Sequence, residues 1–327
     1  MPEKLLSVKD LKIYFDTDMG IVKAVDGISF DVEQGETLGL VGESGCGKSV
    51  TSLSLMKLLP VNGRIAGGQI IFKGEDITQY DKKKMSGIDG KDITMVFQEP
   101  MTSLNPVLKI GDQIMETILL HENVSKREAK EKTSHLIDVV GISRADQIFK
   151  SYPHELSGGM RQRIMIAMAL ACNPSLLIAD EPTTALDVTI QAQILDLIRK
   201  MKSEFKMSIV LITHDLGIIA EMADHVAVMY AGKIVENAPV RDIFSNPMHP
   251  YTRGLLKAKP SIDRLSDRLY SIPGQVPLLI NKPERCHFCD RCPECTDSCM
   301  KGYPENIDNG EGHLVSCTLY SRKEIYV

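Results

Sequence analysis

The chain of 327 residues is 43 % hydrophobic, enough for a sizeable core, and its length predicts roughly two domains. Its 38 basic and 43 acidic side chains leave a net charge of −5, which argues against nucleic acid as the main partner, because such binding usually needs a basic face. It carries neither an apolar run of about 18 residues nor a signal-peptide pattern, so we expect no membrane span and a cytosolic location.

The N-terminal stretch predicts two β segments, residues 5–15 and 20–33, joined by a turn at 18–20. The first segment ends in two aromatic residues, Tyr14 and Phe15. Either ring is a candidate to stack on an adenine base, and the choice of Phe15 rests on the family resemblance described below more than on spacing. Ordinary strand packing is the alternative interpretation of both aromatic residues.

Residues 42–49, Gly-Glu-Ser-Gly-Cys-Gly-Lys-Ser, match the phosphate-loop pattern G-x-x-x-x-G-K-[ST]. An apolar run at 37–41 precedes the motif and a helix-compatible segment at 50–59 follows it. The glycines let the backbone approach phosphates, and N–H groups at the helix start point at them. Lys48 is expected to reach the β- and γ-phosphates, and Ser49 to hold Mg²⁺. The predicted nucleotide contacts of this stretch are Gly42, Ser44, Gly45, Cys46, Gly47, Lys48, Ser49 and Val50.

Further along, residues 67–72 and 77 predict a strand pair, and the lysine-rich stretch 81–84 predicts a solvated loop. An apolar run at 93–97 predicts a buried strand that ends at Gln98. Doubly wound α/β proteins place ligand contacts at such strand ends, so Gln98 is a candidate ligand contact; its assignment to nucleotide and Mg²⁺ binding is what the family resemblance described below implies. A solvated strand end is the alternative.

Helical apolar spacing over 110–120 and 126–140 predicts a helical insertion that spans about 99–165. Ser157, Gly158 and Gly159 fall where the next helix would begin. Their backbone N–H groups and the serine hydroxyl would make a second anion site. A simple helix N-cap is the alternative reading of the serine.

An apolar strand at 175–180 ends in Asp180 and Glu181. We expect Asp180 to take Mg²⁺ and Glu181 to polarise an attacking water. A helix at 188–204 and a buried strand at 207–213 follow, and the strand ends at His214. His214 would hydrogen-bond a γ-phosphate, with a satisfied structural histidine as the alternative. Residues 226–230 and 233–236 predict a closing hairpin.

With these motifs in this order, residues 4–245 resemble the ATPase subunit of an ABC transporter. The resemblance implies an α/β fold: a P-loop NTPase core over 1–245, with a mixed sheet, an antiparallel β part and a helical subdomain. It implies catalytic roles for Glu181 and His214. It also implies two subunits that sandwich two ATP molecules, so that residues 157–159 contact the ATP of the partner subunit. Asp187 would lie at that interface, and Gln98 would link the nucleotide to the membrane-facing insertion.

Residues 152–163, 178–190, 249–252 and 272–277 look like the oligopeptide, dipeptide and nickel importer subfamily. This implies an ATPase that powers import of di- or oligopeptides from the cytoplasmic face of the membrane, as a peripheral protein. The implied partners are a sister ABC ATPase, two transmembrane permeases and an extracytoplasmic peptide-binding protein. Nickel, haem and oligosaccharide remain alternative cargoes, because other subunits choose the cargo.

Residues 246–327 lack α/β alternation and form a Pro-rich, Cys-rich C-terminal domain of the oligopeptide-transporter type, by the same resemblance. In a reducing cytosol, its cysteines favour metal binding over disulfides. Two sets of ligands are open. The subfamily pattern falls on Cys286, Cys292, Cys299 and Cys317. A ferredoxin-like run uses Cys289, Cys292, Cys295 and Cys299, with Met300 in place of the usual proline.

Four thiolates favour a [4Fe–4S] cluster, with Zn²⁺ as the alternative metal. The same region supports a rival function, a redox or iron-sensing regulator that uses ATP only as a ligand.

Overall fold

The computed structural model describes residues 3–98, 103–184, 186–258, 270–277, 280, 283–310 and 312–321. The chain separates into two compact units. The first unit is Met1–Leu5, Glu33–Glu36 and Gln79–Leu211, and the second unit is Leu6–Val32, Thr37–Thr78 and Ile212–Val327. Each is described by itself.

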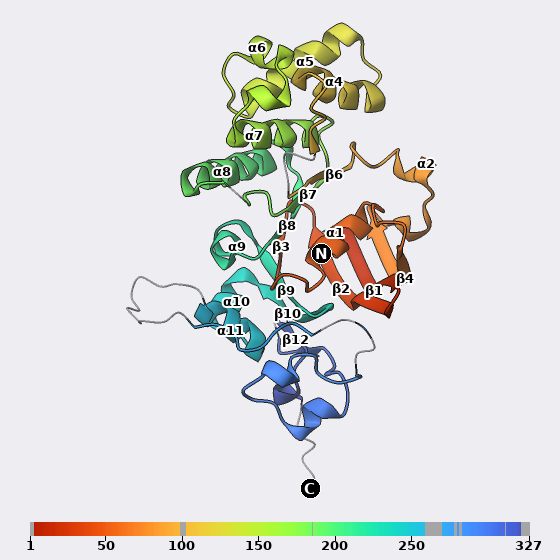
Figure 1. Cartoon of the computed structure of the whole chain (residues 1–327), viewed down its shortest axis with the longest axis vertical. Helices are drawn as coiled ribbons and strands as arrows, with labels where there is room; N and C mark the ends of the chain where they lie inside the picture. The colour runs from red at the N-terminus through yellow and green to blue at the C-terminus, as the bar shows by residue number, and fades with distance from the viewer. Residues whose placement is uncertain are drawn as a thin grey trace. The chain divides into compact units, whose positions relative to one another are not determined.

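The second unit contains a four-stranded antiparallel sheet in the order β2-β1-β4-β5 (Figure 1). Its strands are β1 (Lys4–Thr17), β2 (Gly20–Glu33), β4 (Gly63–Phe72) and β5 (Glu75–Asp76). The two N-terminal strands confirm the predicted β segments. The predicted pair after them is wrong in part, because Ile77 lies in a 3-10 helix, η1 (Ile77–Gln79), and not in a strand.

A mixed set of strands forms the rest of the β structure of this unit, in the order β11-β12-β10-β9-β3. Strand β3 (Thr37–Val41) runs parallel to β9 (His225–Tyr230), and β9 turns back into antiparallel β10 (Lys233–Pro239). The two-residue strands β12 (Leu314–Val315) and β11 (Ile307–Asp308) continue the antiparallel pairing. The C-terminal segment therefore adds strands that its sequence pattern is too short to predict.

The helices of the second unit are short. They are α1 (Lys48–Leu55), α9 (Leu216–Met222), α10 (Val240–Ser245) and α11 (Pro250–Ala258). Helix α1 ends four residues before the predicted end at 59. Near the cysteines, the chain forms three 3-10 turns: η3 (Cys289–Arg291), η4 (Asp297–Met300) and η5 (Thr318–Tyr320).

A buried carboxylate ties the C-terminal segment to β10. Glu236 is only 1 % exposed and accepts hydrogen bonds from the backbone N–H groups of Met248 (2.7 Å) and His249 (2.9 Å). The Nε2 atom of His313 lies 2.8 Å from the same carboxylate. Burial lowers the pKa of His249 to about 3, so this ring stays neutral and its Nδ1 accepts from Tyr251 N–H at the start of α11.

The first unit carries the strands β8-β7-β6 as neighbours. Strand β6 (Ile93–Val96) runs parallel to β7 (Leu176–Asp180), and β8 spans Ser208–Thr213, its last two residues belonging to the second unit. The expectation of a solvated loop at 81–84 is wrong, because Asp81 caps a helical turn, α2 (Lys82–Met85).

Helices make up the remainder of this unit, as predicted for the insertion (Figure 1, yellow to green). They are α4 (Ile110–His121), α5 (Lys126–Val139), α6 (Ala145–Lys150), the 3-10 turn η2 (Pro153–Glu155), α7 (Gly158–Ala169) and α8 (Val188–Phe205). Gly111 in α4 lets Phe149 of α6 pack closely, since a Cβ there would lie 2.2 Å from the ring. In the described part of the chain, no helix has the length and apolar character that a bilayer span requires.

The buried Glu236 contact generates a prediction about stability. We expect His313→Ala to lower the free energy of unfolding by about 1–3 kcal/mol, because the carboxylate stays buried and loses one partner. Urea unfolding, followed by circular dichroism, measures this. His135→Ala is the control, because His135 is exposed on α5, and it should change stability by less than about 0.5 kcal/mol. Equal effects of the two substitutions would contradict the structural role of His313.

Candidate functional site

Two glycines of the loop at 42–49, Gly42 and Gly47, lie too close to neighbouring backbone to accept a side chain. A Cβ at Gly42 would lie 2.2 Å from the carbonyl oxygen of Met229 in β9. A Cβ at Gly47, which adopts a φ of 107°, would lie 2.7 Å from the carbonyl oxygen of Ala24. Gly47 is also the N-cap of α1, so the loop leads directly into the N-terminal end of that helix. This geometry presents backbone N–H groups of the kind that bind phosphates.

Lys48 folds back across its own loop. Its Nζ atom donates to the carbonyl oxygens of Gly42 (2.7 Å) and Glu43 (3.1 Å), and the residue is only 6 % exposed. The neighbouring thiol of Cys46 is fully buried, and burial raises its pKa. Ser49, by contrast, is exposed at the first turn of α1. The loop therefore positions a cation and a hydroxyl at one helix N-terminus.

Neighbouring elements of the second unit hold this loop from outside. The backbone N–H of Glu43 donates to the hydroxyl of Tyr251 in α11 (2.9 Å), and Gly232 N–H donates to the carbonyl of Cys46 (2.9 Å). Sequence reasoning missed Tyr251 and Glu43 as site residues. The only signal was that Tyr251 falls within the motif at 249–252.

In the first unit, the end of β7 carries the two predicted carboxylates. Asp180 is 4 % exposed, whereas Glu181 is half-buried with a φ of 46°. One oxygen of Glu181 accepts from Gln98 Nε2 (3.0 Å) and from the Thr184 hydroxyl (2.8 Å). The structure thus brings Gln98 to Glu181, a contact that the sequence analysis did not predict. Thr184 was not predicted, although it follows in the same polar turn.

The Ser-Gly-Gly turn begins α7. The Ser157 hydroxyl accepts from Met160 N–H (3.3 Å), so the serine is a helix N-cap, while Ser157 and Gly158 remain exposed. Gly159 faces Ile190 of α8, and a Cβ there would lie 2.9 Å from it. Asp187 caps α8 through Ile190 N–H (3.0 Å). An N-cap and an anion site are compatible readings, because both use the same helix N-terminus.

Another residue of α7 links this helix to the chain after the carboxylates. The buried side chain of Gln162 donates to the carbonyl oxygen of Pro182 (2.6 Å). A displacement of α7 would therefore pull on the segment that follows Glu181. The glutamine lies in the motif at 152–163, but its spacing does not predict this partner.

Phe15 and His214 both belong to the second unit. The Phe15 ring lies over Gly63 of β4, where a Cβ would approach it within 2.7 Å, and the residue is partly exposed. The competing Tyr14 donates to Asp26 (2.8 Å), and burial and Asp26 raise the pKa of Tyr14 to about 12. His214 is exposed after β8. The ligand roles of Phe15 and His214 stay predictions.

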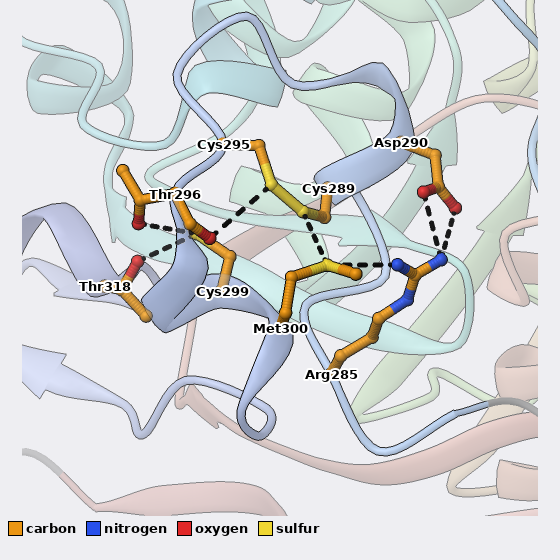
Figure 2. The surroundings of a disulfide bond; sticks show 8 residues. All are labelled: Arg285, Cys289, Asp290, Cys295, Thr296, Cys299, Met300 and Thr318. Carbon is orange, nitrogen blue, oxygen red and sulfur yellow. Dashed lines mark hydrogen bonds and ion pairs between the residues drawn. A yellow bond between two sulfur atoms is a disulfide. The ribbon is translucent and has the colours of Figure 1, made fainter.

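The C-terminal cysteines divide into a disulfide and a set of thiols. Cys289 and Cys295 form the disulfide (Figure 2). The expectation of metal binding in place of disulfides is wrong for this pair, because the turns bring their Cα atoms to 5.3 Å, within disulfide range. The free thiols are Cys286, Cys292, Cys299 and Cys317.

The four free thiols influence one another electrostatically. Burial raises the pKa of Cys286 to about 11, and the charges of Cys299 and Cys292 add to the rise. Burial likewise raises the pKa of Cys317 to about 11, with the other three thiols contributing. Among the described residues, no group of three or more His, Cys, Asp or Glu side chains is arranged to hold a metal ion.

Two protein-family models match the sequence. Residues 25–184 match the ABC transporter family, and residues 235–299 match the C-terminal region of oligopeptide/dipeptide transporters. The chain is 52 % identical to the oligopeptide transport ATP-binding protein AppD of Bacillus subtilis, over 98 % of each chain. It is 50 % identical to the dipeptide transport ATP-binding protein DppD of the same organism, over 98 % of this chain and 96 % of the relative.

Solved structures share the fold. A dimeric ATP-binding cassette in a post-hydrolysis state with ADP and Pi superposes with a TM-score of 0.65 at 23 % identity, over 72 % of this chain and 99 % of that one. The cbiO1 protein of Clostridium perfringens, part of an ABC transporter complex, gives a TM-score of 0.63 at 26 % identity, over 75 % of this chain and 92 % of that one. These likenesses confirm the predicted fold class.

The close packing of Gly42 generates the second prediction. Gly42→Ala would force the loop away from β9, because the added Cβ cannot lie 2.2 Å from the Met229 carbonyl oxygen. We expect binding of a fluorescent ATP analogue, titrated by anisotropy in the presence of Mg²⁺, to weaken at least about tenfold.

The matched control is Gly67→Ala. A Cβ at Gly67 meets only the Lys12 side chain, at an ordinary 3.5 Å. The Gly67→Ala variant should bind the analogue as the unmodified chain does. If Gly42→Ala also binds normally, the loop does not have the rigidity that the structure assigns to it.

Proposed function

Because this chain belongs to the ABC transporter family, among the ATP-binding proteins of oligopeptide and dipeptide importers, we propose that its motifs act as an ATP-hydrolysing motor for peptide uptake. The observation that carries the proposal is the folded phosphate loop. Its backbone is packed against β9 and β2, and Lys48 is already held inside it. Such a loop binds a triphosphate without a large ordering cost.

The residues of the phosphate loop would bind the nucleotide. Backbone N–H groups, or a close approach of the backbone to the phosphates, would come from Gly42, Ser44, Gly45, Cys46, Gly47 and Val50. Lys48 exchanges its carbonyl partners for the β- and γ-phosphates. Phe15 stacks on the adenine. Two observations support these roles. The Phe15 ring is partly exposed, and Lys48 already lies inside the loop.

The hydrolytic step is assigned to Glu181. Gln98 and Thr184 direct one of its oxygens, which fixes the carboxylate as an acceptor for a water proton. A water oriented in this way attacks the γ-phosphate in line with the leaving oxygen. His214 would hydrogen-bond the γ-phosphate and respond to its release.

Mg²⁺ is the metal that such a site uses. Ser49, Gln98 and Asp180 would hold it through hydroxyl, amide and carboxylate oxygens, the ligand chemistry that Mg²⁺ prefers. When bound, Mg²⁺ neutralises charge that develops on the β- and γ-phosphates. Asp180 fits this role because it is a buried carboxylate that a cation would stabilise.

We propose that the motor works as a pair. The exposed turn of Ser157, Gly158 and Gly159 would reach the ATP held by a sister ABC ATPase, with Asp187 at the interface. The exposure of Ser157 and Gly158 supports this. The link from Gln162 to Pro182 offers a route by which the pairing changes the segment after Glu181.

Further partners follow from the importer class. The helical insertion of about 99–165 would dock on two transmembrane permeases, which receive peptides from an extracytoplasmic binding protein. The chain would then sit at the cytoplasmic face of the membrane as a peripheral subunit. We place the ATPase domain over 1–245 and the C-terminal domain over 246–327.

The same C-terminal domain offers a second binding function. We propose that Cys286, Cys292, Cys299 and Cys317 bind a [4Fe–4S] cluster, or Zn²⁺ as the alternative. Their thiols have the donor chemistry of such a group and influence one another's pKa, and the Cys289–Cys295 disulfide leaves these four free. Binding requires the four side chains to turn toward a common centre.

Glu181→Gln tests the hydrolytic assignment. We expect turnover to fall by at least about 10²-fold while ATP binding is retained, because the amide cannot accept the water proton. Phosphate release from the chain assembled with its partners measures turnover. Glu204→Gln, on the exposed side of α8, should leave turnover unchanged. An undiminished rate in Glu181→Gln would remove Glu181 from the mechanism.

Iron, sulfide and zinc analysis of anaerobically purified protein tests the cluster. We expect about four irons per chain and a brown absorbance that Cys317→Ser abolishes and Cys295→Ser preserves. The opposite pattern would assign the ferredoxin-like run, which contains Cys295 and omits Cys317. A colourless protein with one zinc would refute the iron cluster.

A further inference from the structure

The phosphate loop makes a second set of contacts that its motif does not require. Position 43 is a variable position of the motif, yet its glutamate is engaged through every polar group it has. The Glu43 N–H donates to the Tyr251 hydroxyl (2.9 Å), and the Glu43 carbonyl accepts from Lys48 Nζ (3.1 Å). Its carboxylate receives the guanidinium of Arg291, which lies 248 residues further along the chain.

The carboxylate contact is a bidentate ion pair. Arg291 Nη1 donates to one oxygen of Glu43 at 2.6 Å, and Nη2 donates to the other at 3.0 Å. The Arg291 side chain is 5 % exposed and that of Glu43 is 31 % exposed. Two parallel charge-assisted hydrogen bonds fix both distance and orientation, and shielding from water strengthens them. The hydrogen bonds to Glu43 also raise the pKa of Arg291, so the guanidinium stays charged.

The other donors of Arg291 are held by the C-terminal domain. Its Nε donates to the carbonyl of Pro273 (2.8 Å), and Nη2 also donates to that of Ile272 (3.2 Å). Nη1 has the Tyr230 hydroxyl as a further acceptor at 3.5 Å. The guanidinium is therefore engaged on all three of its nitrogens and has little freedom to turn.

Aromatic packing closes the space around this pair. Tyr230 contacts Tyr251 with ring centroids 4.7 Å apart, and Phe288 meets both rings at 5.1 and 5.4 Å. These rings come from β9, from α11 and from the turn just before η3. A rigid wall of this kind transmits a displacement of η3 to the loop, because packed aromatic rings cannot slide without opening a void.

We propose that Arg291 is a positioning residue for the ATP site: through Glu43 it holds the phosphate loop in the shape that binds the triphosphate. The C-terminal domain thereby sets the ATP affinity of the motor. This inference rests on the ATP-binding role proposed above. It gives the motif at 272–277 a purpose, since its carbonyl oxygens hold the arginine.

The test measures Mg·ATP affinity and steady-state ATPase kinetics of the full chain with its partners, in five variants. These are Arg291→Gln, Arg291→Lys, Glu43→Gln, the double variant Glu43→Gln/Arg291→Gln, and the control Asp290→Asn. Asp290 is a suitable control because it neighbours Arg291 in the chain and has its own arginine partner. Arg285 Nη2 donates to both of its carboxylate oxygens, at 3.0 and 2.8 Å.

We expect Arg291→Gln and Glu43→Gln each to raise the KM for ATP about fivefold to tenfold, with kcat changed by less than about twofold. Arg291→Lys should not rescue affinity, since an ammonium cannot bridge both carboxylate oxygens. The double variant should lose no more than either single variant, because the two residues act through one contact. Asp290→Asn should match the unmodified chain.

Other results overturn the proposal. If the single variants bind Mg·ATP normally, or lower only the thermal midpoint, Arg291 serves stability alone. If the losses in the double variant add, the two residues do not act together. Should Arg291→Gln fail to fold, Glu43→Gln decides the matter, because it keeps the shape of a partly exposed side chain. Failure of the unmodified chain to bind Mg·ATP would instead refute the proposed function.

Discussion

The structure depends on one constraint: the phosphate loop must keep a shape that a chain without its glycines and its lysine could not adopt. The close approach of Gly42 to β9 and of Gly47 to β2 leaves no room for a side chain. Lys48 closes the loop from inside by donating to the carbonyl oxygens of Gly42 and Glu43. Strands β9 and β2 and helix α11 contact the loop and hold it in this shape. We propose that a triphosphate meets backbone N–H groups in this fold and takes the Lys48 ammonium from its two carbonyl partners.

The two units divide the chemistry between them. The second unit carries the phosphate-loop motif, and the first carries the carboxylates, with Glu181 accepting hydrogen bonds from Gln98 and Thr184. The exposed Ser157 turn is left facing solvent, which suits a contact that forms only when a partner arrives. Arg291 connects the cysteine-containing turns of the C-terminal segment to the loop, through its ion pair with Glu43.

Local sequence patterns predicted the motifs of the candidate site, but few of the contacts that hold those motifs in place. The phosphate loop, the strand before Asp180 and helix α8 were predictable because fixed spacings and apolar periods specify them. The stretch at 81–84 was mispredicted as a loop because its charge was taken as a loop signal, whereas lysine is a good helix former and Asp81 caps the turn. The ion pair of Glu43 with Arg291 was not predictable, because no local pattern connects residues 248 positions apart. The disulfide of Cys289 with Cys295 was not predictable from a reducing compartment, because it depends on turns that bring the two Cα atoms to 5.3 Å.

The most direct test is a structure of the Glu181→Gln chain paired with its sister ATPase in the presence of Mg·ATP. The account predicts a triphosphate seated on the backbone of residues 42–49, with the Ser157 turn of the neighbouring subunit on its γ-phosphate. It also predicts that Arg291 keeps its contact with Glu43 in this state. An empty loop, or a nucleotide bound elsewhere on the chain, would contradict the account.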